Sequence, residues 1–393
     1  MSKAGNTSVL GRASAAVLGA LIAGQVHAAV NAMVVVEPTQ RKAGLMVSQQ
    51  GVEAGLGKVL GQPVSLATSE DLTDMMRATR SGGYELFIGP AQIAASALSR
   101  GYELLGATQG SEPFVLVVRA DVTDLGALRG RRLYLPQQDS IYTYMARGLL
   151  TQGGLSMQDL RVAHERYPQA GLAALLVGSA DATVVRQSEW KDWQGQHGTA
   201  AKVLASSEPV PGGFSVVVKK DMPADARARL AQWFAAVPAS TGLTQAKFKP
   251  EMQEYKRVAD LGHFTPTQLP GVTRVTAREA QQLQAKGAVL VDTRIEKEFT
   301  ARHIRGALWV PYVEKSLKDV AFNPAMDDFS ALDKADKLKP SQAVIFACNG
   351  AECWKSYKAA KQAQAKGFKT VYWLRGGLPE WEAEGLPVES AGG

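Results

Sequence analysis

The chain contains very little cysteine. Its 393 residues include only two, Cys348 and Cys353, and both lie in the segment IFACNGAECWKS. Such a pair has four possible roles: a structural staple, a metal clip, a redox pair, or a nucleophile with a neighbour. A zinc site is excluded, because it needs about four ligands and no histidine lies near the pair.

The chain also lacks any block of basic residues. Its 44 Lys and Arg and 37 Asp and Glu give a net charge of +7, but the basic residues are dispersed. This dispersal argues against binding to nucleic acid, while a mildly basic surface suits a small anionic ligand. With 46% hydrophobic and 21% charged residues, the composition is that of a soluble globular protein, and the length favours two domains.

Long apolar runs are absent beyond the first residues, which excludes a later membrane-spanning helix. Basic residues Lys3 and Arg12 precede an apolar stretch, residues 13–24, and a small-x-Ala pattern that ends at Ala28. This arrangement predicts a secretory signal peptide, residues 1–28, with an uncleaved anchor as the alternative. Cleavage removes two positive charges, so 7 − 2 leaves +5. Export to a bacterial periplasm would permit disulfides.

Strand-like and helix-like segments alternate between residues 30 and 265, which predicts α/β structure with parallel sheets. Polar residues between Pro266 and Pro270 predict a linker at 266–271. A second alternation follows, over residues 272–390. The clearest predicted strands are 32–38, 63–69, 84–90 and 112–121, and the clearest predicted helices are 52–61 and 70–83.

Residues 29–265 resemble periplasmic solute-binding proteins of the phosphate/phosphonate type. The resemblance implies two α/β lobes joined by a hinge, a ligand in the cleft between them, and an ABC transporter as a partner. It rests on four stretches: YELFIGPAQIAASA, VVRADVTDLGALRGRRLYLPQQDSIYTYMARGLL, GLAALLVGSADATVV and GGFSVVVKKDMPADARARLAQWF.

The second of these stretches resembles the family's crossover, a strand and the ligand loop, and the ligand loop falls at QQDSIYTYMARGLL. Asp139 and Ser140 suit the start of a helix, where free N–H groups and the hydroxyls of Ser140 and Thr143 would receive an oxyanion. Tyr142 or a neighbouring tyrosine would add a donor, and His164 falls where such proteins often place a ligand contact. The alternative is that Asp139 and Ser140 only cap the helix, since an inward carboxylate would oppose an anion.

Residues 272–390 resemble a rhodanese domain, which implies a second α/β domain with a parallel sheet. In the rhodanese family, the acid and the arginine that match Asp292 and Arg294, and the turn that matches the HIRGA segment, are mainly structural. The matching pieces, in chain order, are Asp292-Thr293-Arg294, Glu298-Phe299, the HIRGA segment at 303–307, Gly367-Phe368, 371–374, Gly376-Gly377, Trp381 and the GLPV segment at 385–388.

The resemblance implies sulfur transfer through a persulfide on Cys348. The apolar strand AVIFA ends directly before this cysteine, and a helix begins near Trp354, so the thiol lies where α/β proteins bind ligands. The loop between them would form an amide cradle that stabilises a thiolate and then an anionic persulfide. That cradle consists of Asn349, Gly350, Ala351, Glu352 and Trp354.

The loop departs from the family pattern of Cys, four residues, Arg and then Ser or Thr. Cys353 occupies the arginine position, and Lys355-Ser356 follows two places later. We therefore expect a longer loop in which Lys355 replaces the charge of the arginine. Thiosulfate is then expected to be a poor donor, and phosphatase-like chemistry is disfavoured.

Cys353 has three possible roles. As a resolving thiol it would attack a Cys348 persulfide or sulfenate and leave a disulfide. It could also be a plain cradle residue, or half of a structural staple that gains little because the loop is short.

The sequence thus predicts a sulfurtransferase coupled to a small-anion-binding domain. The alternatives are a solute receptor with a non-catalytic rhodanese appendage, and a thiol–disulfide oxidoreductase. Expected partners are a sulfur donor, a sulfur acceptor and a periplasmic thiol reductant, with no cofactor or metal and no nucleic acid.

Overall fold

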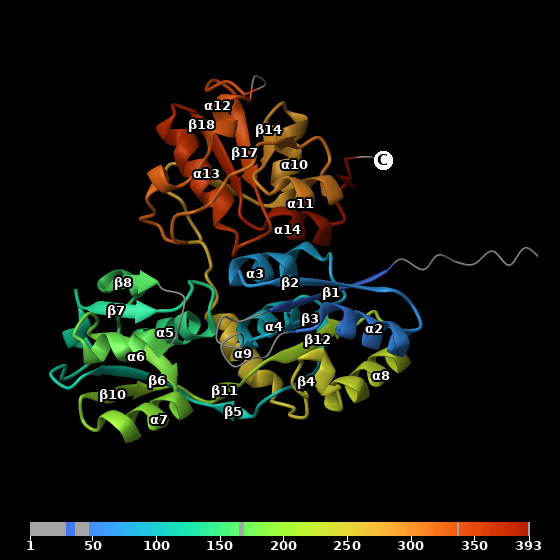
Figure 1. The fold of residues 1–393 in the computed structure, drawn as a ribbon. Helices are drawn as coiled ribbons and strands as arrows, with labels where there is room; N and C mark the ends of the chain where they lie inside the picture. The colour runs from blue at the N-terminus through green and yellow to red at the C-terminus, as the bar shows by residue number, and fades with distance from the viewer. Residues whose placement is uncertain (1–28, 36–46, 165–168, 336–337, 392–393) are drawn as a thin grey trace, which may run out of the picture.

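The computed structural model describes residues 29–35, 47–164, 169–335 and 338–391. The predicted signal peptide, residues 1–28, lies outside the described residues, so its cleavage stays a prediction. We call β1 to α9 the N-terminal domain and β13 to β19 the C-terminal domain, drawn in Figure 1 in blue to yellow and in orange to red. None of the described helices is both long enough and apolar enough to cross a membrane.

The first lobe of the N-terminal domain is a five-stranded sheet in the order β2-β1-β3-β12-β4. The predicted strands and helices of residues 32–90 all occur in it. Its strands are β1 (Val30–Val35), β2 (Val64–Ser69), β3 (Leu86–Gly89), β4 (Tyr102–Ala107) and β12 (Ser215–Lys219). Its helices are α2 (Gln49–Leu60), α3 (Leu72–Ser81), α4 (Ala91–Leu98), η3 (Ala239–Thr241), α8 (Ala224–Ala235) and α9 (Met252–Asp260).

Helix α3 shows why its sequence folds as it does. The Asp71 side chain accepts the Thr73 N–H as an N-cap, and Gly82 ends the helix in a left-handed conformation. Its buried side chains include Leu72, Met75, Met76 and Thr79, which is helical spacing and defines one face toward the sheet. Two arginines, at 77 and 80, lie on the remaining face, three residues apart.

The second lobe is another five-stranded sheet, in the order β10-β6-β9-β7-β8. Its strands are β6 (Phe114–Arg119), β7 (Arg132–Leu135), β8 (Arg161–His164), β9 (Ala182–Arg186) and β10 (Ala201–Ser206). Its helices are η1 (Gly126–Leu128), α5 (Ile141–Gln152), η2 (Met157–Asp159), α6 (Gln169–Leu176) and α7 (Gln187–His197).

The prediction of parallel sheets is only partly right for this domain. Strand β12 runs antiparallel to β3 and β4, and β6 runs antiparallel to β9 and β10. The chain crosses between the lobes through β5 (Ser111–Glu112) and returns through β11 (Val210–Pro211), which pair with each other. Neither connection between the lobes contains a helix. Each therefore lacks the helical connection that usually joins two parallel strands.

The C-terminal domain confirms the predicted parallel sheet. Its order is β13-β18-β17-β14-β16, and every pair is parallel. Its strands are β13 (Thr273–Val275), β14 (Val289–Asp292), β16 (Leu308–Trp309), β17 (Ala343–Ala347) and β18 (Thr370–Leu374), with β15 (His303–Ile304) and β19 (Val388–Glu389) as a separate antiparallel pair. Its helices are α10 (Ala277–Ala285), α11 (Glu296–Ala301), η4 (Pro324–Met326), α12 (Ser330–Asp333), α13 (Trp354–Ala365) and α14 (Gly377–Ala383).

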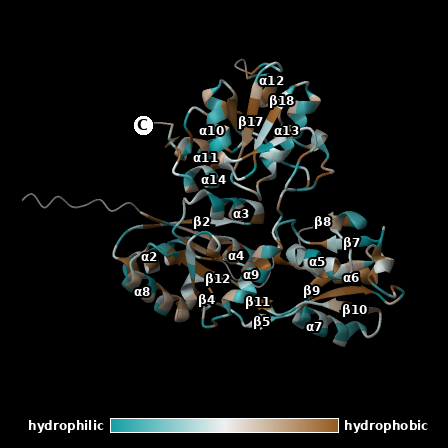
Figure 2. Ribbon diagram, turned by 180° about the vertical axis from the view of Figure 1, so that it is seen from behind, coloured by the Kyte–Doolittle hydropathy of each residue, from teal (hydrophilic) through white to brown (hydrophobic). Residues whose placement is uncertain are grey.

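Strand β17 is the centre of this sheet and is buried on both faces. Alternate side chains enter different clusters: Val344 and Phe346 pack with Trp373, whereas Ile345 packs with Trp381 on the other side. Figure 2 shows β17, like β12 and β9 of the other domain, in the brown of hydrophobic residues. A strand buried in this way holds whatever follows its last residue in a fixed place.

The C-terminal domain lies over α3 of the first lobe (Figure 1). Charged pairs join the two domains: Arg100 with Glu352, Arg77 with Glu298 and Lys318 with Asp139. The predicted linker is also packed onto the C-terminal domain, since Thr265 and Leu269 are buried. The Thr265 N–H and hydroxyl both donate to the carbonyl of Ala351 at 2.8 Å.

Candidate functional site

Cys348 follows β17 directly, at the carboxyl edge of the parallel sheet. The hydroxyl and the N–H of Thr293, which follows β14, donate to the Ala347 carbonyl at 2.9 and 3.2 Å. The Leu378 N–H donates to the Cys348 carbonyl at 2.9 Å. Contacts from the residue after β14 and from the start of α14 therefore fix the backbone that carries the thiol, and Cys348 is buried.

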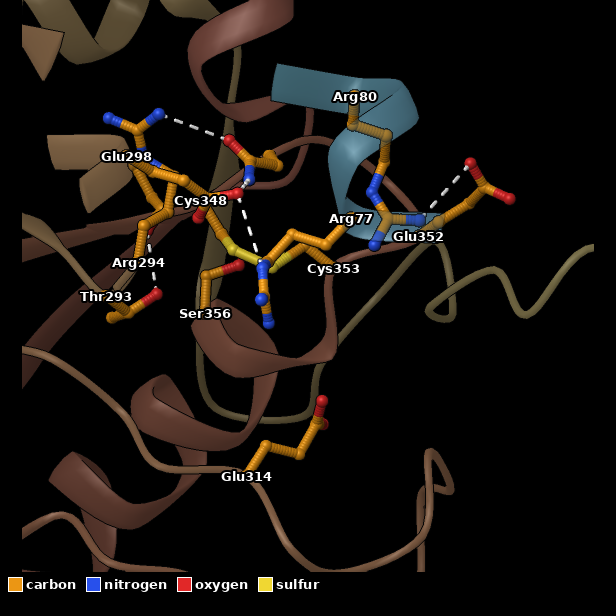
Figure 3. Close-up of a disulfide and its surroundings, with 12 residues drawn as sticks. Arg77, Arg80, Thr293, Arg294, Glu298, Glu314, Cys348, Glu352, Cys353 and Ser356 are labelled. Atoms are coloured by element: carbon orange, nitrogen blue, oxygen red, sulfur yellow. Dashed lines mark hydrogen bonds and ion pairs between the residues drawn. A yellow bond between two sulfur atoms is a disulfide. The ribbon is translucent and has the colours of Figure 1, made fainter. Parts of the chain in front are cut away.

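Cys348 and Cys353 form a disulfide in this structure, with their Cα atoms 6.1 Å apart (Figure 3). The loop between them turns at Gly350, whose φ of 94° lies in the left-handed region and whose carbonyl accepts the Cys353 N–H at 2.9 Å. Gly377 packs so closely that a Cβ there would lie 2.0 Å from the Cys348 carbonyl oxygen. The loop conformation therefore depends on glycine at both positions.

Cys353 is the N-cap of α13, and its side chain makes no capping hydrogen bond. Helix α13 has 12 residues and starts directly after the disulfide. The N–H groups of its first turn donate no capping hydrogen bond to the Cys353 side chain. The positive end of the helix dipole lies at the same place. This geometry suits a thiolate or an anionic persulfide on either cysteine.

A buried network beneath the loop holds the residue next to Cys348. Arg294 donates to both carboxylate oxygens of Asp292 at 2.7 to 3.0 Å and to the Asn349 Oδ1 at 3.2 Å. The Asn349 Nδ2 donates in turn to the Glu298 Oε1 at 2.9 Å. Burial raises the pKa of Glu298 against the opposing charges of Arg77 and Arg294. Asn349, one of the predicted cradle residues, is therefore oriented from below the loop.

Glu352 and Trp354, the other two large cradle residues, contact the part of the chain that precedes the C-terminal domain. Glu352 forms an ion pair with Arg100 of the N-terminal domain, and the Trp354 Nε1 donates to the His263 carbonyl at 2.9 Å. Ala351 accepts from the linker, as described above. The predicted cradle is therefore also the surface on which the two domains meet.

Four cations line a small pocket beside the disulfide: Lys318 and Lys355 of the C-terminal domain, and Arg77 and Arg80 of α3. Figure 3 shows the two arginines of α3 beside the cysteine pair. Three acids, at 298, 314 and 352, line the same pocket. Burial lowers the pKa of Lys355, and the charge of Arg77 lowers it further. The pocket is about 30 Å³, which is space for one or two water molecules. Among the described residues there is no group of three or more His, Cys, Asp and Glu that could hold a metal ion.

The predicted anion site at the start of α5 has its hydroxyls engaged within the protein. Ser140 caps the helix and accepts the Thr143 N–H at 3.3 Å, and the Thr143 hydroxyl donates to the Gln137 carbonyl at 3.0 Å. Buried Asp139 pairs with Lys318 of the C-terminal domain. Burial alone would raise the pKa of Asp139, but the Lys318 ammonium outweighs it and the pKa is lowered.

The remaining predicted contacts of that site have other partners. The Tyr142 hydroxyl donates to Glu189 at 2.8 Å, and the His164 Nδ1 lies 2.8 Å from the Pro136 carbonyl oxygen. Burial lowers the pKa of His164. A role for these side chains in binding an anion stays a prediction.

Two protein families match the chain. Residues 34–268, more than half of its length, match the family described as the periplasmic substrate-binding protein of a phosphonate ABC transporter. The chain belongs to this family. Residues 276–384 match the rhodanese-like domain. From here on we call the two parts the binding domain and the rhodanese domain.

Curated relatives match the rhodanese domain. The thiosulfate sulfurtransferase GlpE of Pseudomonas savastanoi pv. phaseolicola is 33% identical over 110 residues, which cover 28% of this chain and 87% of that protein. GlpE of Ectopseudomonas mendocina is 32% identical over 120 residues, covering 30% and 93%. The rhodanese-like domain-containing protein 14 of Arabidopsis thaliana chloroplasts is 29% identical, and the chain covers 66% of its length. The C-terminal part therefore belongs to the rhodanese family.

Solved structures match the binding domain at low identity. The PhnD1 protein of Prochlorococcus marinus, in complex with methylphosphonate, has a TM-score of 0.45 and 13% identity, covering 60% of this chain and 97% of that one. The periplasmic aliphatic sulphonate binding protein SsuA of Escherichia coli has a TM-score of 0.34 and 15% identity, covering 59% and 78%.

Sequence reasoning missed Arg77 and Arg80 of the binding domain. The sequence predicts Lys355 near the cysteines. Nothing in the sequence of the rhodanese domain predicts that α3, about 270 residues earlier in the chain, lies beside them. The one available signal is that both arginines lie on the face of α3 opposite its apolar stripe. That face is covered here by the rhodanese domain.

Proposed function

We propose that this protein is an exported sulfurtransferase whose rhodanese domain carries sulfane sulfur on Cys348. One observation supports this most directly. Cys348 follows a buried parallel strand, meets Cys353 at the start of α13, and lies beside four cations in one pocket. A buried thiol with a helix N-terminus and positive charge is suited to attack as a thiolate.

The transfer has two balanced steps. The Cys348 thiolate attacks the outer sulfur of a donor such as thiosulfate, forming one S–S bond and breaking another, and sulfite leaves with the electron pair. An acceptor nucleophile then takes the outer sulfur of the persulfide, and the Cys348 thiolate is the leaving group. Amide groups and cations near the sulfur stabilise the anion throughout.

Cys353 has the role of a resolving thiol in this proposal. Its thiolate attacks the Cys348 sulfur of the persulfide, which forms the Cys348–Cys353 disulfide and releases HS⁻. A protein dithiol in the same compartment then reduces the disulfide and is itself oxidised. The bonded pair is the expected resting product of that step.

Family membership supports the remaining parts of the proposal. The periplasmic binding-protein family favours export to the periplasm, a small anionic ligand and an ABC transporter as a partner. The disulfide is compatible with that compartment. The site at Ser140 and Thr143 is one candidate place for the ligand.

Intact mass spectrometry of the reduced protein after exposure to thiosulfate tests the proposal. One added sulfur, about +32 Da, is expected on the parent, lost in Cys348→Ser, and longer-lived in Cys353→Ser. A reversed pattern between the two variants would reverse the assigned roles.

The disulfide favours a second candidate function, a thiol–disulfide oxidoreductase. A parent that never gains sulfur but exchanges its disulfide with a dithiol protein would be that enzyme. A parent that does neither would be a solute receptor with a non-catalytic rhodanese appendage.

A further inference from the structure

A second, larger cavity lies between α3 and the rhodanese domain. Its volume is about 750 Å³, and its walls come from β1, β2 and α3 on one side and from residues around α11 and α14 on the other. Four residues line both this cavity and the small pocket at the disulfide: Arg77, Arg80, Glu298 and Asn349. These four side chains therefore stand between the large cavity and the cysteine pair.

The cavity is lined by more basic than acidic side chains. Five basic residues (Arg77, Arg80, Arg294, Lys297 and Arg302) and three acidic residues (Asp74, Glu298 and Glu382) give 5 − 3 = +2. Some of these charges are paired with each other, as in the 2.6 Å contact between Arg302 and Glu382 and the 2.5 Å contact between Arg77 and Asp74. Arg294 is paired as well, with Asp292 outside the lining, so the excess falls to 4 − 3 = +1.

Arg80, which lines both cavities, has an incomplete set of hydrogen bonds. Its side chain is only 6% exposed, yet its Nε has no hydrogen-bond partner among the described residues. Its Nη1 lies 3.9 Å from the Glu352 Oε2, which is too far for a hydrogen bond. A buried guanidinium with a free donor is destabilising by itself, so its place at the edge of a cavity points to an acceptor supplied by a ligand.

We infer that this interdomain cavity is the donor site for the sulfur transfer, and that it takes an anionic organic sulfane donor, such as a thiosulfonate, held by Arg80 and Arg77. The inference rests on the proposed function and assigns its substrate class. It also accounts for the cysteine loop: the arginine position of that loop is occupied by Cys353, and α3 of the binding domain supplies the missing guanidinium groups.

The size of the cavity decides between small and large donors. Thiosulfate has five heavy atoms, whereas a volume of several hundred Å³ is typical of pockets for much larger ligands. The pocket at the sulfur itself holds only one or two waters, so the bulk of a donor must lie in the large cavity. A thiosulfonate fits this arrangement, with its organic group in the cavity and its terminal sulfur directed at Cys348.

The step balances without any further reagent. The Cys348 thiolate attacks the terminal sulfur of R–SO₂–S⁻, an S–S bond forms to give the persulfide anion, and the bond to the sulfonyl sulfur breaks. The sulfinate R–SO₂⁻ leaves with the electron pair. Arg80 and Arg77 bind the sulfonyl oxygens before the step and the sulfinate after it.

The test uses the full chain with Cys353→Ser, so that a single thiol remains. Persulfide formation with benzenethiosulfonate is followed by mass over a range of concentrations in that background. Arg80→Gln is expected to raise the half-saturating concentration about 10-fold, which is the loss of one charge-assisted hydrogen bond, and Arg77→Gln/Arg80→Gln more. Arg278→Gln is the matched control, because Arg278 forms an exposed pair with Glu384 and lines neither cavity.

A second measurement needs no sulfur transfer. Alkylation of Cys348 by iodoacetate, an anion, is compared with alkylation by neutral iodoacetamide. The arginine variants are expected to slow iodoacetate selectively, and equal slowing of both reagents would indicate a disturbed fold and would count against the inference. Unchanged benzenethiosulfonate kinetics in the double variant would overturn it. A third outcome is that the parent forms no persulfide, while Arg80→Gln removes the preference for iodoacetate over iodoacetamide. That outcome would refute the sulfur transfer and retain the anion site.

Discussion

At the scale of single residues, Gly377 determines how closely the cysteine loop packs on α14. Its φ of 57° is left-handed, and a Cβ at this position would lie 2.0 Å from the Cys348 carbonyl oxygen and 2.7 Å from the Gly350 nitrogen. Both neighbours are backbone atoms, which no side-chain rotation can move away.

We expect Gly377→Ala to lower the unfolding midpoint and to speed the reduction of the disulfide by dithiothreitol, because the loop must shift. Gly385→Ala is the matched control, since Gly385 is also left-handed, with φ of 66°, but has nothing within 4 Å of the added Cβ. The control should show only the backbone penalty, about 1–2 kcal/mol. Equal effects of the two substitutions would show that crowding at Cys348 is unimportant.

The sequence predicts single residues well where the signal is local. Cys348 after a buried strand and Cys353 at a helix start both follow from the pattern AVIFACNGAECW. Arg77 and Arg80 could not be found in this way, because their role depends on how two domains dock. Their spacing predicts a polar helix face, and only the structure shows what covers it.

At the scale of elements, the same limit applies to the strands. The apolar run at 112–121 predicts that β6 exists, and it does. It does not predict the direction of β6, which runs antiparallel to β9, just as β12 runs antiparallel to β3; the two crossings between the lobes set both directions. The linker was likewise predicted from its prolines, while its burial against Ala351 and Arg375 is a tertiary property.

Arg375 secures this linker. Its guanidinium donates to the Thr265 carbonyl at 2.7 Å and to the Pro266 carbonyl at 2.9 Å. We expect Arg375→Gln to speed proteolytic cleavage within residues 265–271, because this segment loses three hydrogen bonds from Arg375, two to backbone carbonyls and one to the Thr265 hydroxyl. Arg278→Gln, which removes a surface pair with Glu384, is the control and should cleave at the parental rate. Cleavage elsewhere first would contradict the prediction.

The segment before the linker contains a buried histidine. His263 contacts Arg147 of α5, and its carbonyl accepts from Trp354 of α13. Burial lowers the pKa of His263 well below its usual value, and the Arg147 charge adds to this. The native protein therefore keeps His263 neutral at a pH where an unfolded chain would protonate it.

The sign of the pH effect follows. Below about pH 6.5 the unfolded state binds a proton that the native state does not, so the free energy of unfolding falls by up to ~1.4 kcal/mol per pH unit. We expect His263→Gln to flatten the stability curve between pH 5 and 6.5. Chemical denaturation of parent and variant at several pH values measures this, and parallel curves would show that His263 does not titrate in that window.

At the scale of the whole molecule, residues of both domains line the candidate site. The binding domain supplies α3 to the wall of the cysteine pocket, and the rhodanese domain supplies Lys318 to Asp139 at the start of α5. Each domain thus places a charged side chain beside the candidate site of the other. On the proposed function, we expect docking to affect sulfur transfer, so that a change at one interdomain contact alters both sites.

The Lys318–Asp139 pair is the contact with which to test this coupling. Both residues are buried, with 8% and 1% exposure, so removing one partner leaves an uncompensated charge in the interior. We expect Lys318→Met to lower the free energy of unfolding by ~3–5 kcal/mol, and Lys318→Met/Asp139→Asn to recover part of that loss. Gln158→Ala, which removes an exposed 3.1 Å contact with Asp319 across the same interface, should change stability little.

The decisive readout is at the cysteine pocket. If docking positions α3, Asp139→Asn should weaken persulfide formation with benzenethiosulfonate, because it breaks the same pair at a residue that lines neither cavity. Lys318→Met should weaken it too, but Lys318 lines the small pocket at the disulfide, so its effect is partly direct. The double variant, which relieves the unpaired charge, should regain part of that activity together with its stability. A variant that loses stability but keeps parental kinetics would show that the cysteine pocket forms without the Lys318 contact. The two sites would then be joined only by the linker and by the arginine contacts of Glu352 and Glu298.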